Sequence, residues 1–171
     1  MRRLSPLRIL PCLVAVLPLA ACGGGNAPPP PTPGRRVEAV PDGDRLYRGD
    51  RTAVDSVMVV INDPQTLQLW WQRATAEAPE PRPGVPTVDF DQHTVLMVSA
   101  GRMNNGDRIR VDSLGFEVQA EPGGGRSEVW FAVVRTTRDC NPLPGVRYPL
   151  EFVRISKVQD VRFDPRVTSC P

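Results

Sequence analysis

The sequence contains almost no histidine and almost no lysine. Among its 171 residues His93 is the one histidine, and nearly all positive charge comes from arginine. A metal site built on several imidazoles is therefore excluded, and no cofactor or metal is expected. The chain also lacks a block or stripe of basic residues, which argues against a nucleic-acid partner. Its 21 basic and 19 acidic residues nearly balance.

Long apolar runs are also missing. The longest, residues 9–19, is too short to span a bilayer and follows three arginines, a pattern typical of a secretory signal. Small residues then lead directly into Cys22. This junction resembles the lipobox of bacterial lipoproteins, in which the signal is cut before the cysteine and the thiol is acylated. The alternative is an ordinary secretory signal cut between residues 19 and 25, with Cys22 an incidental thiol.

A lipid on Cys22 is a sufficient anchor for a small domain. Each buried methylene contributes about 0.8 kcal/mol, so two or three acyl chains hold the protein on a membrane without a transmembrane helix. We therefore expect a lipoprotein signal over residues 1–21 and a lipidated tether rich in glycine and proline over residues 22–52. Gly23 after the cysteine favours the outer membrane of a bacterial envelope, as the lipoprotein pattern implies.

The four cysteines divide by position. Cys12 leaves with the signal and Cys22 carries the lipid, so Cys140 and Cys170 remain as a pair in an oxidising compartment. We expect a disulfide between them, which closes about thirty residues and contributes about 3 kcal/mol on the loop-entropy model. The alternatives are two free thiols or a metal site, and the second would need further ligands.

Residues 53–171 are long enough for one globular domain. A helix is predicted near Pro64–Ala76, because Asn62 or Asp63 can cap it and Pro64 suits its first turn. The other apolar runs are short and bounded by turn residues, which is typical of strands. The predicted strands are residues 56–62, 94–100, 108–112, 115–120, 128–135, 150–155 and 158–163.

These elements predict an α+β fold, mainly an antiparallel β-sheet of about six or seven strands, rolled or sandwich-like, with one packed helix. Residues 104–107 (Asn-Asn-Gly-Asp) suit a two-residue hairpin turn, and residues 121–125 a looser one. Residues 129–134 are apolar on both faces, which predicts a central, covered strand.

A set of short motifs occurs in order along the chain: Val88-Asp89-Phe90-Asp91, Thr94 to Val98, Gly101, Gly106 and Pro149 to Lys157. Together these motifs resemble the PrcB family, named for a lipoprotein subunit of a bacterial surface protease complex. The resemblance implies a non-catalytic domain that binds or stabilises another envelope protein. The family's Thr-Gly-Gly-Tyr turn is replaced here by residues 104–107, Leu150 replaces an aromatic residue and Ser156 a proline.

Candidates for catalysis or metal binding are sparse. His93 has no nucleophile beside it in the sequence, so a surface histidine is favoured over a general base of a hydrolase. Asp89 and Asp91 fit a turn-capping role better than an acid/base pair. The acidic residues 42, 44 and 50 hint at a calcium loop but lack its later ligands.

The sequence therefore predicts a non-catalytic, lipid-anchored envelope protein whose partner is another envelope protein, such as a secreted or surface protease. The alternative is a cell-surface module that binds peptide or glycan. The predicted interaction surface combines the glycine-containing loop with the helix tryptophans, namely Arg102, Met103, Asn104, Asn105, Gly106, Asp107, Trp70 and Trp71. Of the adjacent tryptophans, at most one can point at the core.

Overall fold

The computed structural model describes residues 35–41, 44–51, 54–141, 143–158 and 160–168. The predicted signal, Cys22, the glycine- and proline-rich part of the tether and Cys170 lie outside these residues. Pro33–Pro171 makes up one compact unit.

Ten strands and one helix are found within the described residues. In chain order they are β1 (Arg35–Ala39), β2 (Arg45–Gly49), β3 (Ser56–Ile61), α1 (Pro64–Ala74), β4 (His93–Ala100), β5 (Met103–Asn105), β6 (Arg108–Ala120), β7 (Arg126–Thr137), β8 (Leu143–Arg147), β9 (Leu150–Ser156) and β10 (Val161–Thr168). The predicted α+β, mainly antiparallel fold class is confirmed, with more strands than expected.

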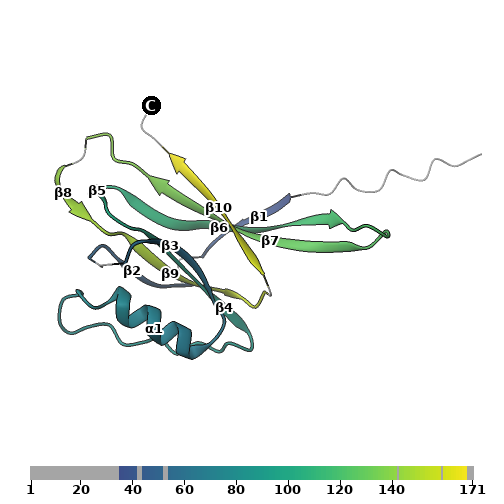
Figure 1. Ribbon diagram of the computed structural model, residues 1–171, viewed down its shortest axis with the longest axis horizontal. Coiled ribbons are helices and arrows are strands. Elements are labelled where there is room, and N and C mark those ends of the chain that lie inside the picture. The colour runs from purple at the N-terminus through teal and green to yellow at the C-terminus, as the bar shows by residue number, and fades with distance from the viewer. Residues whose placement is uncertain (1–34, 42–43, 52–53, 142, 159, 169–171) are drawn as a thin grey trace, which may run out of the picture. The chain divides into compact units, whose positions relative to one another are not determined.

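Two four-stranded sheets form most of the domain (Figure 1). The hairpin sheet has the strand order β1-β6-β7-β10, and the helix sheet has the order β2-β9-β4-β3. Every pair in these two sheets is antiparallel except β7 and β10, which are parallel. Strands β5 and β8 pair as a small third sheet.

A shared apolar core joins the hairpin sheet to the helix sheet, so the domain is a sandwich. This core takes buried side chains from β4 and β9 on one side and from β6 and β7 on the other. Its buried members are Val40, Leu96, Val98, Ile109, Val111, Ala132, Val134, Val153, Ile155 and Val158. Residues 131–134 of β7 are all buried, as predicted for a central strand.

Helix α1 covers the other face of the helix sheet (Figure 1). Asp63 caps it by accepting a 2.8 Å hydrogen bond from the Thr66 N–H, and Pro64 occupies its first turn, as predicted. Leu67, Trp71 and Ala74 are buried against the sheet. Because both faces of the helix sheet are covered, residues 94–99 of β4 are buried without interruption.

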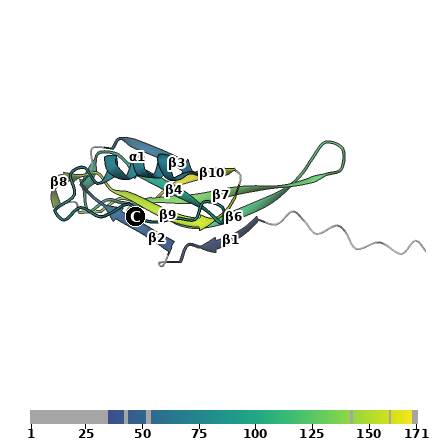
Figure 2. The same ribbon diagram turned by 90° about the horizontal axis from the view of Figure 1, so that it is seen from below.

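The sequence predicted two separate strands where the structure has the single long strand β6. A bulge between Val111 and Ser113 interrupts its register with β7, and a bulge bends and twists a strand. Beyond it, β6 and β7 continue as a hairpin closed by the predicted turn at residues 121–125, where the Gly125 carbonyl accepts from the Glu121 N–H. Both views show this hairpin extending past the helix sheet (Figure 1, Figure 2).

The hairpin predicted around residues 104–107 is wrong, because the strands on either side of the turn do not pair with each other. The turn itself forms, since the Asp107 N–H donates to the Asn104 carbonyl at 3.1 Å. However, β4 pairs with β3 and β9, whereas β6 pairs with β1 and β7. The turn therefore carries the chain from one sheet to another, and β5 pairs instead with β8.

The predicted domain boundary at residue 53 differs from the structure. Strands β1 and β2, assigned to the tether, pair with β6 and β9. The sequence analysis missed these strands because their charged side chains break the apolar pattern expected of a strand. Strands at the edge of a sheet tolerate charge that a central strand does not. Within the described ranges, no helix has the length and apolar character needed to cross a membrane.

Candidate functional site

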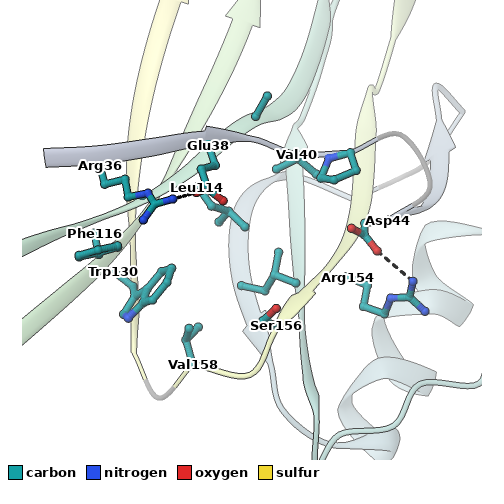
Figure 3. A pocket seen from close by; sticks show the side chains of 14 residues that line it. Arg36, Glu38, Val40, Asp44, Leu114, Phe116, Trp130, Arg154, Ser156 and Val158 are labelled. Carbon is teal, nitrogen blue, oxygen red and sulfur yellow. Dashed lines mark hydrogen bonds and ion pairs between the residues drawn. The ribbon is translucent and has the colours of Figure 1, made fainter.

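A cavity of about 440 Å³ opens where the β6–β7 hairpin leaves the sandwich (Figure 3). Strand β1 passes along one side of it, and the end of β9 forms the opposite side. Its apolar walls are Val40, Leu114, Phe116, Trp130, Ile155 and Val158. A cavity of this size with mostly apolar walls suits one or two side chains of a ligand.

An aromatic pair forms one wall of the cavity. Phe116 of β6 and Trp130 of β7 face each other in the strand register, and their ring centroids lie 5.2 Å apart. Both side chains are half-buried. Aromatic rings that stay partly exposed beside a cavity can bury further surface when a ligand arrives.

The rim of the cavity is charged, and its charges are paired. Arg36 and Glu38 of β1 form an ion pair at 2.8 Å, and Asp44 and Arg154 form another at 2.9 Å (Figure 3). The Arg36–Glu38 side chains are mostly exposed. The mouth therefore presents both signs of charge around an apolar interior.

A second cavity, of about 500 Å³, lies next to the first. Trp130 and Val158 line both of them. Its other walls come from Glu128, Val129, Lys157, Asp160 and Arg162. Trp130 thus borders both cavities.

Gly115 allows β1 to lie close to the hairpin. A Cβ atom at this position would collide with the Arg36 carbonyl oxygen and with the Phe131 ring. Since any other residue would push β1 outward, this glycine fixes the side of the cavity that Arg36 and Glu38 line.

The bulge that directs the hairpin is held by a buried carboxylate. Glu151 of β9 has a side chain that is 0% exposed, and its Oε2 accepts a 2.7 Å hydrogen bond from the Val111 N–H at the bulge. Its Oε1 accepts from Arg45 at 2.7 Å and from Arg48 at 2.8 Å. The Arg45 guanidinium also donates to the Val111 carbonyl at 3.3 Å.

This network links the two sheets, because Glu151 belongs to β9 and Val111 to β6. A buried carboxylate is costly unless its charge and lone pairs are satisfied, and Glu151 has two arginines and one backbone N–H as partners. The sequence analysis missed it. The single detectable signal was an acidic residue inside the otherwise apolar run 150–153.

The predicted interaction loop is partly exposed. Arg102 and Asn104 are exposed and Met103 is half-buried. With Asp107, Arg138 and Val146 they line a polar recess of about 230 Å³. The loop is thus accessible, although its recess is smaller and more polar than the cavity beside the hairpin.

Asp107, also predicted as part of that surface, is buried instead. Its carboxylate accepts hydrogen bonds from the Asn104 N–H at 3.3 Å and from the Asp139 N–H at 2.8 Å. Gly106 has a φ of 107°, and a Cβ there would meet the Asp139 side chain. The turn is therefore fixed against the segment that precedes Cys140.

Of the two helix tryptophans, only one points into the core, as predicted. Trp71 is 3% exposed, donates its Nε1–H to the Pro83 carbonyl at 3.0 Å, and packs on Tyr47 and Phe152. Trp70 is half-buried, with the Arg73 guanidinium 5.3 Å from its ring centroid. Trp71 thus belongs to the core, and only Trp70 remains a surface candidate.

For the predicted disulfide, the described residues include Cys140 but not Cys170. Cys140 is disulfide-bonded in the structure. Cys170 lies outside the described residues, so the pairing of these two cysteines remains a prediction.

The Asp89 side chain, close to His93 in the sequence, has a structural role. Asp89 accepts a 2.9 Å hydrogen bond from the Asp91 N–H through its side chain, and its carbonyl accepts from the His93 N–H. His93 faces Ser156 across the β4–β9 pair, but no hydrogen bond joins their side chains in the described structure. The turn-capping interpretation of Asp89 is confirmed.

Acidic residues of the suggested calcium loop are engaged elsewhere. Asp44 pairs with Arg154, and Asp50 pairs with Arg147 at 3.2 Å, whereas Asp42 is not among the described residues. In the part of the chain that is described, no three His, Cys, Asp or Glu side chains are grouped so that they could hold a metal ion.

Comparison with known proteins gives no match to a protein-family model, a curated protein or a solved structure. The resemblance to the PrcB family therefore rests on the motifs in the sequence.

Proposed function

We propose that this chain is a lipid-anchored protein of the bacterial cell envelope, in the outer membrane, that acts by binding another envelope protein. The cavity beside Phe116 and Trp130 receives a part of that partner. The observation that carries the proposal is this half-buried aromatic pair, which lines an open apolar cavity.

Aromatic side chains in partly open pockets commonly supply most of the binding energy of a protein interface. Here Trp130 is half-buried and borders both cavities, so a bound side chain can remove further aromatic surface from water. The paired charges of the rim, Arg36 with Glu38 and Asp44 with Arg154, suit the polar margin that surrounds such an anchor.

The proposed role is non-catalytic. Among the described residues that line the cavity, Ser156 is the one with a hydroxyl side chain. His93, opposite it, is turned to the Asp89 carbonyl, with Nδ1 at 3.2 Å. A nucleophile needs a base within hydrogen-bond distance, and this pair lacks that contact. Binding without chemistry accounts for the cavity with fewer assumptions.

The resemblance to the PrcB family and the lipobox at Cys22 support the same proposal. They favour an accessory protein that is held on a membrane by its lipid and that binds or stabilises a secreted or surface protease. The polar recess at Arg102–Asp107 is the second candidate surface for the same partner.

Photocrosslinking in cells tests the proposal. Phe116 is replaced by its photoreactive analogue benzoylphenylalanine in the full chain, and irradiated membranes are examined by mass spectrometry. The proposal predicts covalent adducts with an envelope protein. The matched control carries the same analogue at Val167 of β10, which is 61% exposed and lies outside both cavities.

Adducts at position 116 and none at position 167 support the proposal. If position 116 gives no protein adduct in a folded, membrane-bound chain, or gives adducts with polysaccharide alone, the proposal is contradicted. Polysaccharide adducts would favour the glycan-binding alternative.

A further inference from the structure

We propose that β3 is a second interaction site, where two copies of this chain pair edge to edge. This inference goes beyond the proposed function and does not depend on it. It arises from a comparison of the four edge strands. In Figure 2, β3 and β10 run along one side of the sandwich, and β1 and β2 run along the other.

Three of these edges carry the residues that natural proteins use to prevent further strand pairing. Strand β1 has Arg36 and Glu38, and β2 has Arg45 and Arg48. Strand β10 alternates charges around a proline, with Arg162, Asp164, Pro165 and Arg166. Charge and proline at a sheet edge keep other strands from adding to it.

Strand β3 has none of these features. Its sequence is Ser-Val-Met-Val-Val-Ile, without charge, proline or a bulge in its register with β4. Strands of this composition are the ones that accept an additional strand when their outer edge is free. Since the other three edges carry charge or proline and β3 carries neither, we infer that the β3 edge serves to pair with another strand.

The side chains of β3 also leave both apolar clusters incomplete at this edge. Val57 and Val59 contact the cluster under α1, and Met58 and Val60 contact the cluster between the sheets. All four are only half-buried, whereas the facing residues of β4 are fully buried. A further strand beside β3 would cover both rows of side chains.

A strand that fits this edge must be uncharged and apolar on both faces. The central residues of β4 and β7 also meet this requirement, but both of these strands are already paired on both sides. Among the edge strands of the described sheets, β3 itself is the one that meets it and still has a free edge. A second copy can pair antiparallel about a two-fold axis perpendicular to the sheet. Facing residues must then share a face of the sheet, so the pairing is centred on Met58 or on Val59.

The pairing would join two helix sheets into one continuous sheet. Trp70 of α1 contacts the same cluster as Val57 and Val59 and is half-buried. It lies on the covered face of that sheet, so the joined strands would extend the apolar layer beneath it. The pairing would thus extend the surroundings of Trp70, the half-buried aromatic residue of the predicted surface.

Cysteine crosslinking in native membranes tests the inference. Facing residues in an antiparallel pair have Cα atoms about 4.5–5.5 Å apart, which is within disulfide range. Met58→Cys and Val59→Cys are introduced separately into the full chain and oxidised. We expect at least one of them to give a band of twice the subunit mass that reduction removes, while Val167→Cys on β10 gives none.

A second variant checks that the crosslink reports strand pairing. Adding Val59→Lys to the Met58→Cys chain, or Met58→Lys to the Val59→Cys chain, places two lysines at diagonal positions on one face of the pair. It also gives the edge the charge that opposes strand addition, so the crosslink should be abolished. The β-branched, uncharged Val59→Thr should retain it. Absence of the doubled band in both cysteine variants, or a band that survives the lysine substitution in a folded chain, overturns the inference.

Discussion

Two aromatic groups with nearly the same geometry have different surroundings. In the closed group, Trp71 lies 5.3 Å from Tyr47 and 5.1 Å from Phe152 between ring centroids. In the open group, Phe116 lies 5.2 Å from Trp130. Trp71 of α1 and Phe152 of β9 are buried between the helix and its sheet, whereas Phe116 and Trp130 border a cavity. The distance between rings therefore does not tell a core aromatic group from one at a binding site. What differs is that α1 covers the closed group, whereas among the described residues no such layer covers the cavity side of the open group.

The largest expected effect separates these two groups directly. Phe152 is 0% exposed, so Phe152→Ala should lower the free energy of unfolding by about 3–5 kcal/mol. Trp130→Ala should lower it by about 1–2 kcal/mol, because only part of that side chain leaves water on folding. Guanidinium unfolding of both variants measures the difference. Equal losses would show that Trp130 is a core residue.

Removal of the Glu151 carboxylate should break the link between the two sheets. Glu151→Ala leaves Arg45 and the Val111 N–H without their buried partner, and we expect a loss of about 3 kcal/mol. Glu151→Gln keeps an oxygen for the Val111 N–H and should lose less. Unfolding curves of both variants test this, and a neutral Glu151→Ala would contradict the network's role.

Within the loop at residues 102–107, we expect substitutions of Arg102 and Met103 to leave stability nearly unchanged and substitution of the buried Asp107 to lower it. Asp107→Ala leaves two backbone N–H groups without an acceptor and should cost about 2 kcal/mol. Arg102→Ala combined with Met103→Ala should keep the melting temperature within a few degrees. If that stable double variant loses its partner, the binding surface is this loop and not the cavity.

The smallest effect concerns the start of the helix that covers the closed group. The hydrogen bond from the Thr66 N–H lowers the pKa of Asp63 below its usual value. The contribution of ionised Asp63 to the free energy of unfolding is therefore fully present above the unfolded-state pKa of about 3.9. It is lost as the pH falls through the lower pKa of the folded state.

Asp63→Asn should keep the cap but remove this pH dependence, while Asp63→Ala should lose both. Melting temperatures of the three proteins between acidic and neutral pH test the assignment. The same acid response in Asp63→Asn as in the parent chain would assign it to another group.

Local signals in the sequence were sufficient for much of the fold. Pro64 and Asp63 mark the helix start, and apolar runs mark β3, β4, β7 and β9 because their side chains pack in the two apolar clusters. The short or charged strands β1, β2, β5 and β8 were missed. Their pairing depends on distant partners, which no local pattern records.

The site was harder to predict than the fold. The apolar residues 129–134, which include Trp130, predicted a covered strand and gave no sign of a cavity. The bulge at Asp112 has no clear local signature either. Cavities arise where layers separate, so they depend on how strands bend and not on residue type alone. The Asn104–Asp107 turn was found because glycine at positive φ has a local cause.

The most direct test of the account is the recovery of the crosslinked partner with Trp130→Ala. Anchored protein is purified from cells that make equal amounts of the parent chain, Trp130→Ala and the exposed control Val167→Ala, and bound partner is quantified per molecule. The account predicts at least a tenfold loss of partner for Trp130→Ala, corresponding to about 1.4 kcal/mol of binding energy, and none for Val167→Ala. Full recovery with a folded Trp130→Ala would contradict it.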